Sequence, residues 1–257
     1  MSHFQEQFKA GRHQLGKQPA SYDKRNFKLS KYLLAPPPAA ADWLKGSSWP
    51  MYANDTLGDC VEAAAGHMIG SWQSYIYPTA APPTTAQIIQ AYSGATGYNP
   101  SKPWTDNGTN LLSFLKYWRK TGVAGHKILA FMSIQPGNLT ELQQAIWLFG
   151  AAMIGVALPL TAQGESQWTV PDGLQGNNAP GSWGGHCVPV GAYNDHAAAM
   201  DRNTVVTWGA ALTMSDYFFQ CYSDEAYAVL SQDWIDAKGL APNQFDLKTL
   251  QADLAAL

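Results

Sequence analysis

Two short stretches, NDTLGDCVEAAAGHM (residues 54–68) and GSWGGHCVPVGAYN (residues 181–194), indicate the fold of this 257-residue chain. The first places Cys60 in the first turn of a predicted helix, because apolar residues recur after it at helical spacing. The second places His186 at the start of an alternating, strand-like run. Thiol catalysis requires these two groups, a nucleophile and an imidazole that moves its proton.

The local sequence around Cys60 bears on its reactivity. Asp59 is positioned to cap the helix, and Glu62, three residues later, completes an expected capping box. Unpaired N–H groups and the helix dipole favour a negatively charged sulfur at Cys60, although the carboxylate of Asp59 opposes it. An isolated cysteine is also commonly an ordinary buried residue, which is the interpretation we give to Cys187 and Cys221.

His186 lies at one end of a predicted hairpin. A strand-like run over 187–193 is followed by a polar turn over 194–203 and a second run over 204–209. Cys60 and His186 are far apart in the sequence, as in papain-type cysteine enzymes, which argues against a local metal site.

Several segments together resemble the papain-like cysteine peptidase superfamily. LAPPPAAADWLKGSSWPMYANDTLGDC (34–60) resembles the start of a mature peptidase, and DNGTNLLSFLKYWRKTGV (106–123) resembles the glycine turn and second helix. TELQQAIWLFGAAMIGVAL (140–158) resembles a helix that leads into a barrel strand, GGHCVPVGAYN (184–194) the histidine strand, and VVTWG (205–209) the Asn-Ser-Trp-Gly strand. The resemblance spans about residues 36–230 and implies a two-lobed α+β fold. A helical half is followed by an antiparallel β half, with the active cleft between them.

The resemblance also implies roles for individual residues. Cys60 would be the nucleophile, and His186 would act as base and acid. The side-chain amide of Asn54, with the Cys60 backbone N–H, would stabilise an oxyanion; alternatively, Asn54 is only a turn residue before the helix. The residues implied to bind substrate are Gly108, Gly185 and Trp208.

Two of these assignments have structural alternatives. Gly108 can serve only as the start of a helix that Thr109 or Asn110 caps. Trp208, like Trp168 and Trp183, can belong to the core rather than to an aromatic cleft lining.

The chain departs from the family where the histidine is oriented. Val206 occupies the position of the family's asparagine, directly before Thr207 and Trp208. The polar residues of the 194–203 turn are of order 20 Å from His186, because strands rise about 3.3 Å per residue. We therefore predict that no Asn, Asp or Glu of the hairpin reaches the imidazole. Packing under Trp208, with a backbone carbonyl, water or the Thr207 hydroxyl, would hold the ring.

The composition favours a compact protein that does not enter a membrane. No apolar run is long enough to span one, and the first residues lack a signal-peptide core. Three cysteines form no disulfide framework, so we expect a cytoplasmic protein, with association with a phage particle as an alternative. We find no metal or cofactor pattern, since His67 is a helix-face residue about 10 Å along the helix from Cys60.

Charge and periodicity divide the chain into three parts. Residues 1–35 form an arm of net charge +5, whereas the remainder carries −8. Such an arm can bind an acidic partner or nucleic acid, but we favour a strap lying on the protein's own acidic surface. The papain-like domain is expected over 36–243, with a helical lobe over about 36–125 and a β lobe over about 126–243. A C-terminal amphipathic helix is expected over 244–257, packing on the body or mediating self-association.

These observations favour a cysteine hydrolase that acts on an amide bond of a peptide or protein through a Cys60–His186 dyad and a thioester. The main alternative is a non-enzymatic member of the fold, a binding or structural module such as one in a phage particle, which Val206 favours. A peptide ligase or transamidase would use the same dyad.

Overall fold

The computed structural model describes residues 13–234 and 245–256. Residues 1–12 of the arm, residues 235–244 and Leu257 of the predicted tail helix lie outside the described residues. Helices are expected from periodicity over about 59–77, 85–93, 110–121 and 140–149 and within 244–257, and all are found within a few residues of these bounds. They are α2 (Cys60–Ile76), α3 (Thr85–Thr96), α4 (Leu111–Lys120), α5 (Leu139–Phe149) and α8 (Leu247–Ala255), joined by α6 (Asp216–Tyr222), which was not predicted.

The β half follows the helical half, so the predicted α+β order is confirmed. Its strands are β1 (Ala40–Asp42), β2 (Ile128–Ser133), β3 (Ala152–Leu158), β4 (Gln167–Trp168), β5 (Gly184–Asn194), β6 (Asn203–Thr207), β7 (Ala210–Met214) and β8 (Ser223–Ser231). Short 3-10 turns connect them, namely η1 (Leu29–Tyr32), η2 (Pro103–Thr105), η3 (Leu160–Ala162) and η4 (Gly176–Asn178). Strands β1, β4 and β7, which have three, two and five residues, were not predicted.

Strand β5 is the centre of the sheet and carries His186. The strand order is β2-β8-β3-β5-β6-β7-β4, and β1 pairs with β5 outside this path. β3 and β5 are antiparallel, with Val156 opposite His186 and Gly155 opposite Cys187. β5 and β6 form the predicted hairpin, whose connection covers the expected polar turn. His186 therefore lies near the start of the central strand, which packs against α2.

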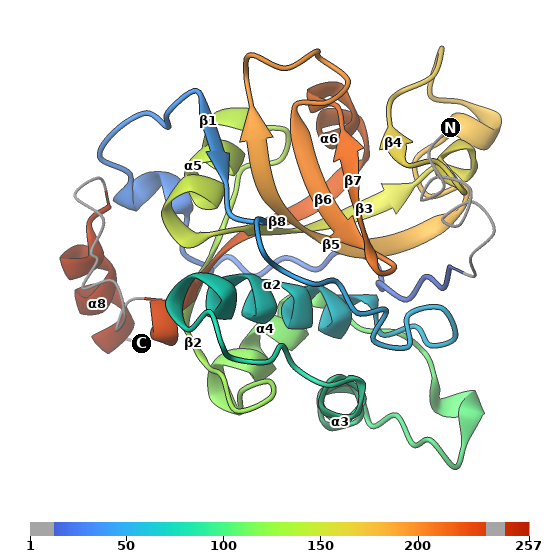
Figure 1. The fold of residues 1–257 in the computed structure, drawn as a ribbon, viewed down its shortest axis with the longest axis horizontal. Coiled ribbons are helices and arrows are strands. Elements are labelled where there is room, and N and C mark those ends of the chain that lie inside the picture. Colours follow the sequence, from blue (N-terminus) through green and yellow to red (C-terminus); the bar gives the residue numbers. More distant parts are fainter. Residues whose placement is uncertain (1–12, 235–244, 257) are drawn as a thin grey trace.

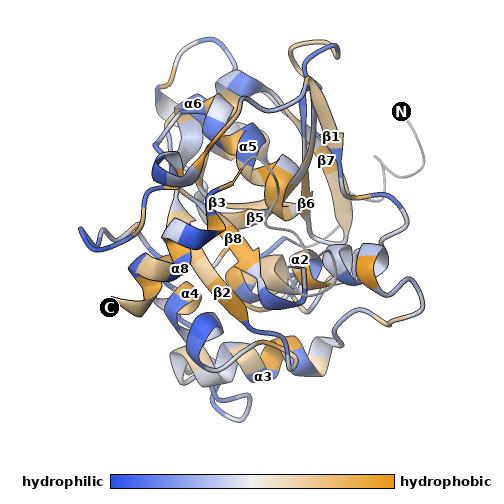
Figure 2. Ribbon diagram, turned by 90° about the vertical axis from the view of Figure 1, so that its left-hand side faces the viewer, coloured by the Kyte–Doolittle hydropathy of each residue, from blue (hydrophilic) through white to orange (hydrophobic). Residues whose placement is uncertain are grey.

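Two buried hydrophobic clusters pack on opposite sides of the sheet. The first fills the space between the sheet, α5 and α6, and includes Leu142, Val188 and Phe218. The second lies between α2, α3 and α4 and one side of the sheet, and includes Val61 and Trp118. Figure 1 shows α2 lying along the sheet with α3 and α4 beyond it. Hydrophobic residues are concentrated on β2 and β8 and on the helix sides that face them (Figure 2).

The C-terminal helix packs on the body of the same chain. Leu250 is fully buried, and Leu247 and Leu254 are partly buried against the first cluster. Asp253 accepts hydrogen bonds from the Tyr32 hydroxyl at 2.7 Å and from Lys31 Nζ at 2.6 Å. The apolar stripe predicted from the leucine spacing is therefore covered by η1 and its surroundings.

The described part of the basic arm lies on the protein's own acidic groups, as predicted. Lys17 pairs with Asp224 and Glu225 of β8, and Lys31 pairs with Asp253 of α8. In Figure 1 the arm, in dark blue, runs between the sheet and the layer of α2. In the part of the chain that the structure describes, no helix is both long and apolar enough to cross a membrane.

Candidate active site

Cys60 is the first residue of α2, as the sequence predicts, but the capping box is wrong. Asp59 is the N-cap residue and makes no side-chain capping hydrogen bond. Glu62 instead accepts hydrogen bonds at 2.9 and 3.1 Å from the hydroxyl of Thr109. Asn110 caps α4 by accepting a hydrogen bond from the Ser113 N–H. The Thr109 hydroxyl is therefore available to donate to Glu62.

The Cys60 thiol is covered, with 1% of the residue exposed. The backbone N–H groups of Cys187 and Gly16 lie close to the sulfur and lower its pKa. Burial, followed by the charges of Glu62 and Asp59, outweighs them and raises the pKa of Cys60 to about 12. The expected stabilised thiolate is therefore wrong for this arrangement of the chain, because the covered sulfur is out of contact with water.

His186 is oriented as the hairpin geometry predicts. Its Nε2 shares a hydrogen bond of 2.6 Å with the Thr207 hydroxyl, and its ring stacks on Trp208 with centroids 4.1 Å apart. Among the described residues, no Asn, Asp or Glu of the hairpin hydrogen-bonds to it, so that prediction is confirmed. Thr207 is therefore the residue that orients the imidazole. Val206, the neighbouring residue, lies on the opposite face of β6 and cannot do so.

The His186 imidazole is neutral and has one nitrogen available. The ring is fully buried, and burial lowers its pKa to about 3. In the described structure, Nδ1 is buried without a hydrogen-bond partner. Because the backbone N–H of Cys187, the next residue, lies close to the Cys60 sulfur, the imidazole and the thiol lie at the same end of β5.

Asn54 presents its amide to a carbonyl in the cleft. It is 2% exposed, and its Nδ2 donates to the Leu57 carbonyl at 3.1 Å and to the Gln14 carbonyl at 3.3 Å. The indole N–H of Trp208 donates to the same Gln14 oxygen at 3.2 Å. Two of the residues singled out from the sequence therefore converge on one peptide oxygen.

The carbonyl belongs to the arm, which passes through the site in extended form. The Gln14 N–H donates to the Asn54 carbonyl at 3.0 Å, and the Lys17 N–H donates to the Gly185 carbonyl at 3.1 Å. Thr109 donates its N–H to the Gly16 carbonyl at 2.8 Å and accepts from the Gln18 N–H at 3.0 Å. We call residues 14–18 the cleft segment.

The backbone conformation and the close packing at position 108 require glycine. Its φ is +71°, and a Cβ placed there would lie 1.9 Å from the Gly16 carbonyl oxygen. A side chain at this position would exclude the cleft segment, so the close approach of the two backbones requires glycine. Of the six residues assigned from the sequence, four lie against the cleft segment, namely Asn54, Gly108, Gly185 and Trp208.

The cleft segment itself was missed from the sequence. Its charge indicated a strap on an acidic surface, but nothing in the spacing of the arm distinguishes residues 14–18 from their neighbours. Gly16 is the one available signal, since a Cβ there would lie 1.9 Å from the Gly58 carbonyl oxygen. The reason why residue 16 is a glycine is therefore visible only in the tertiary structure.

Buried carboxyl groups lie beneath the thiol. Asp59 and Glu62 are fully buried, and Asp106 accepts from the Gly58 N–H and the Tyr92 hydroxyl. Burial raises the pKa of Glu62 well above its usual value, and the charge of Asp59 adds to the effect. No group of three or more His, Cys, Asp or Glu residues in the described ranges is arranged to hold a metal ion.

Glu62→Gln is expected to stabilise the protein increasingly as pH rises. A carboxyl whose folded-state pKa is raised binds more protons folded than unfolded, so it costs stability above its unfolded pKa of about 4.3. Glutamine keeps an oxygen for the Thr109 hydroxyl and removes the titration. Urea unfolding at pH 4, 6 and 8 should show a free-energy difference that grows from pH 4 upward. Asp172→Asn, at an exposed loop carboxyl, is the control, and a pH-independent difference for Glu62→Gln would contradict the assignment.

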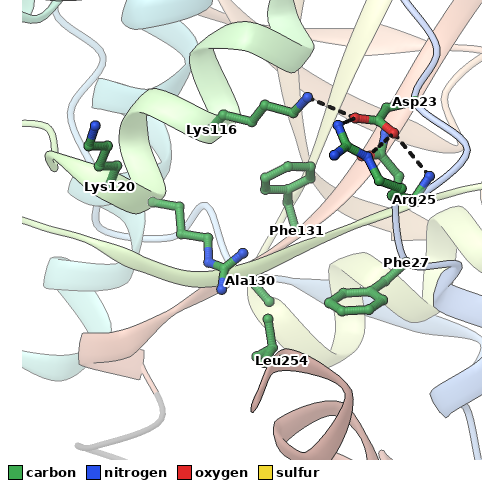
Figure 3. A pocket seen from close by; sticks show the side chains of 10 residues that line it. Asp23, Arg25, Phe27, Lys116, Lys120, Ala130, Phe131 and Leu254 are labelled. Carbon is green, nitrogen blue, oxygen red and sulfur yellow. Dashed lines mark hydrogen bonds and ion pairs between the residues drawn. The ribbon is translucent and has the colours of Figure 1, made fainter. Parts of the chain in front are cut away.

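A second pocket lies away from the thiol. It has a volume of about 450 Å³ and is bordered by the arm, α4, β2 and α8. Figure 3 shows the Asp23 carboxylate between Lys116 and Arg25, with Phe27 and Phe131 nearby. The residues that line this pocket include none of the candidate site residues and no Cys, Ser, Thr or His.

Comparison with known proteins identifies the fold. No protein-family model matches this chain, and no curated protein matches its sequence. Among solved structures, xylellain, a cysteine protease from Xylella fastidiosa, is similar with a TM-score of 0.60 and 14% identity, over 86% of this chain and 97% of that one. Digestive procathepsin L2 proteinase from Tenebrio molitor larval midgut has a TM-score of 0.58 and 12% identity, over 88% and 80%. A recombinant stem bromelain precursor has a TM-score of 0.54 and 15% identity, over 90% and 80%. The chain therefore has the papain-like fold that the sequence resemblance predicted.

Proposed function

We propose that this protein is a papain-like cysteine hydrolase that cleaves amide bonds, a peptidase that uses Cys60 and His186. One observation carries the proposal. An extended peptide, the cleft segment, is bound through its backbone by Asn54, Thr109, Gly185 and Trp208, directly over the thiol. A surface that binds a peptide main chain in this way, beside a cysteine and a neutral imidazole, has the parts that peptide hydrolysis needs.

The residues perform the reaction in two steps. Cys60 transfers its proton to His186 Nδ1, and the sulfur attacks the substrate carbonyl carbon. The oxyanion accepts hydrogen bonds from Asn54 Nδ2 and the Cys60 N–H. His186 returns the proton to the leaving amine as the C–N bond breaks, which leaves a thioester. Water then attacks the thioester, with His186 again moving the proton.

The bound arm does not satisfy these requirements itself. The sulfur lies beside the Gly16 N–H, whereas attack requires a carbonyl carbon. The carbonyl beside Asn54 is that of Gln14, two residues earlier in the chain. The cleft segment therefore occupies the cleft without being positioned for cleavage, and a substrate has to displace it.

A non-enzymatic binding module is the alternative that a specific observation favours. The covered Cys60 has a raised pKa, and the described structure gives His186 Nδ1 no hydrogen-bond partner. Intact-mass analysis after incubation with a peptide vinyl sulfone, with and without Cys60→Ser, separates the two functions. A single adduct that Cys60→Ser abolishes supports the hydrolase, and the absence of any adduct when peptide still binds supports the binding module.

Asn54→Ala is expected to lower kcat by about 10²–10³-fold with little change in KM. The reason is that the side-chain donor stabilises charge that develops only in the transition state. Steady-state kinetics on a variant of unchanged melting temperature provides the measurement. Asp55→Ala, in the same turn, is the matched control, and an equal loss in both variants would assign Asn54 to the turn alone.

A further inference from the structure

The Lys17 ammonium is buried in the cleft between two carboxylates. Its side chain is 1% exposed, and Nζ lies 2.9 Å from Asp224 Oδ2 and 3.2 Å from Glu225 Oε1. Nζ also donates to the Gln18 carbonyl at 3.1 Å. Charged groups are rarely buried unless they are paired, so this cluster is a built cation site.

The body of the protein forms this site, and the arm only occupies it. Asp224 and Glu225 are the second and third residues of β8, and Gly155 of β3 lies opposite Glu225 in the antiparallel register. A Cβ on Gly155 would lie 2.1 Å from Lys17 Cε and 2.7 Å from Glu225 Cγ. The missing side chain at Gly155 therefore provides the space that the lysine stem fills. We call Gly155, Asp224 and Glu225 the acidic pocket.

The acidic pocket adjoins the reacting sulfur. Lys17 donates its backbone N–H to the Gly185 carbonyl, directly before His186. The backbone N–H of the preceding residue, Gly16, lies close to the Cys60 sulfur. Consecutive residues are about 3.8 Å apart, so a side chain in the pocket belongs to a residue within about two positions of the one that contacts the sulfur.

The pocket penalises a neutral occupant. The Glu225 side chain is 6% exposed and that of Asp224 is 34% exposed, so Glu225 forms the interior and Asp224 the mouth. Burial raises the pKa of Glu225, and Lys17 offsets part of the rise. An uncharged side chain would leave the buried carboxylate unpaired, and sites of this kind discriminate strongly against a substrate that lacks the matching group.

We propose that the acidic pocket selects peptide substrates with a basic residue, lysine above all, within two positions of the cleaved bond. The inference rests on the proposed hydrolase function and names its substrate class. Lys17 is then the arm's own occupant of a subsite that a substrate lysine takes when the arm leaves the cleft. The competing interpretation is that the acidic pocket is only a latch, that is, a site that binds Lys17 and holds the arm in the cleft.

Matched peptides test the proposal on the full chain. Two pairs of acetylated coumarin amides carry lysine or norleucine, either next to the cleaved amide or one residue further away. Binding is measured with fluorescein-labelled forms of the same peptides on the Cys60→Ala chain, and turnover is measured on the wild-type chain. The arm competes equally with both members of a pair, so their ratio reports the pocket alone.

We expect lysine to be preferred by about 10²-fold in one pair, in binding and in kcat/KM. Asp224→Asn with Glu225→Gln should bring the ratio close to one, and Gly155→Val should weaken binding of both lysine peptides. Asp195→Asn, in the β5–β6 turn, removes a carboxylate outside the pocket and should leave the ratio unchanged. Melting temperatures identify variants that fail to fold, and the two pocket changes act on different strands.

The outcomes separate the pocket from the function. Lysine-selective binding without turnover retains the acidic pocket and refutes the hydrolase. Turnover at equal rates for lysine and norleucine retains the hydrolase and overturns the pocket as a substrate site. Equal binding of both peptides, or no binding of either, likewise reduces the acidic pocket to a latch for the arm.

Discussion

Gly16→Ala is expected to raise the alkylation rate of Cys60 near neutral pH by about 10²–10³-fold. The methyl group would lie 1.9 Å from the Gly58 carbonyl oxygen and 2.3 Å from the carbonyl carbon, and both are backbone atoms rather than the end of a flexible side chain. The cleft segment must leave, and the sulfur then contacts water. A thiol that returns from a pKa of about 12 toward its usual value of about 8.5 gains thiolate by about 10³-fold.

Timed iodoacetamide labelling with peptide mapping measures this change. In the wild-type chain the half-buried Cys221 should react first, since Cys60 and Cys187 are buried. In Gly16→Ala the order changes to Cys60 first. Cys187 must stay protected, because its labelling would report general unfolding. Lys24→Ala, at an exposed arm position, is the matched control, and equal Cys60 rates in Gly16→Ala and wild type would mean that the arm does not cover the thiol.

Cys60→Ala and His186→Ala are each expected to lower kcat by about 10⁴–10⁶-fold, and the double variant no further. Groups that act in one proton-coupled step are not additive, because removing either one stops the same step. The loss should appear in the Gly16→Ala chain as well, where the cleft is open. Cys221→Ala should leave kcat unchanged, since that thiol lies on α6 and outside the site.

Release of coumarin from the lysine peptides provides the rate, and melting temperatures confirm that the variants fold. A His186→Ala chain that keeps more than a tenth of the activity would remove the imidazole from the mechanism. If Gly16→Ala exposes Cys60 but cleaves no peptide, the protein is a binding module with the papain-like fold.

Local pattern and motif were enough to place the main elements and the candidate residues. Apolar spacing after Cys60 predicted α2, and alternation after His186 predicted the β5–β6 hairpin, because both periodicities are properties of a few neighbouring residues. Strand geometry excluded the turn carboxylates as partners of His186 for the same reason. The order of these segments predicted the α+β fold that the solved structures share.

Hydrogen-bond partners and local charge were decided by the tertiary structure. The spacing of Asp59 and Glu62 predicted a capping box. However, α2 is buried at its start, and the hydroxyl of Thr109, from a distant segment, donates to Glu62. Thr207 was one of several groups that the sequence allowed beside His186. Which of them is in contact depends on where β6 lies against β5, and that position is set by packing over the whole sheet.

The sequence by itself determined the candidate residues, which are a cysteine at a helix start, a histidine at a strand start and an amide six residues before the cysteine. Only the tertiary structure decided the state of those groups. Residues 14–18 of the arm cover the thiol, and Lys17 enters a pocket made by β3 and β8. The physical reason is that pKa and access depend on burial and on charges brought together from distant parts of the chain, and no local sequence window contains them.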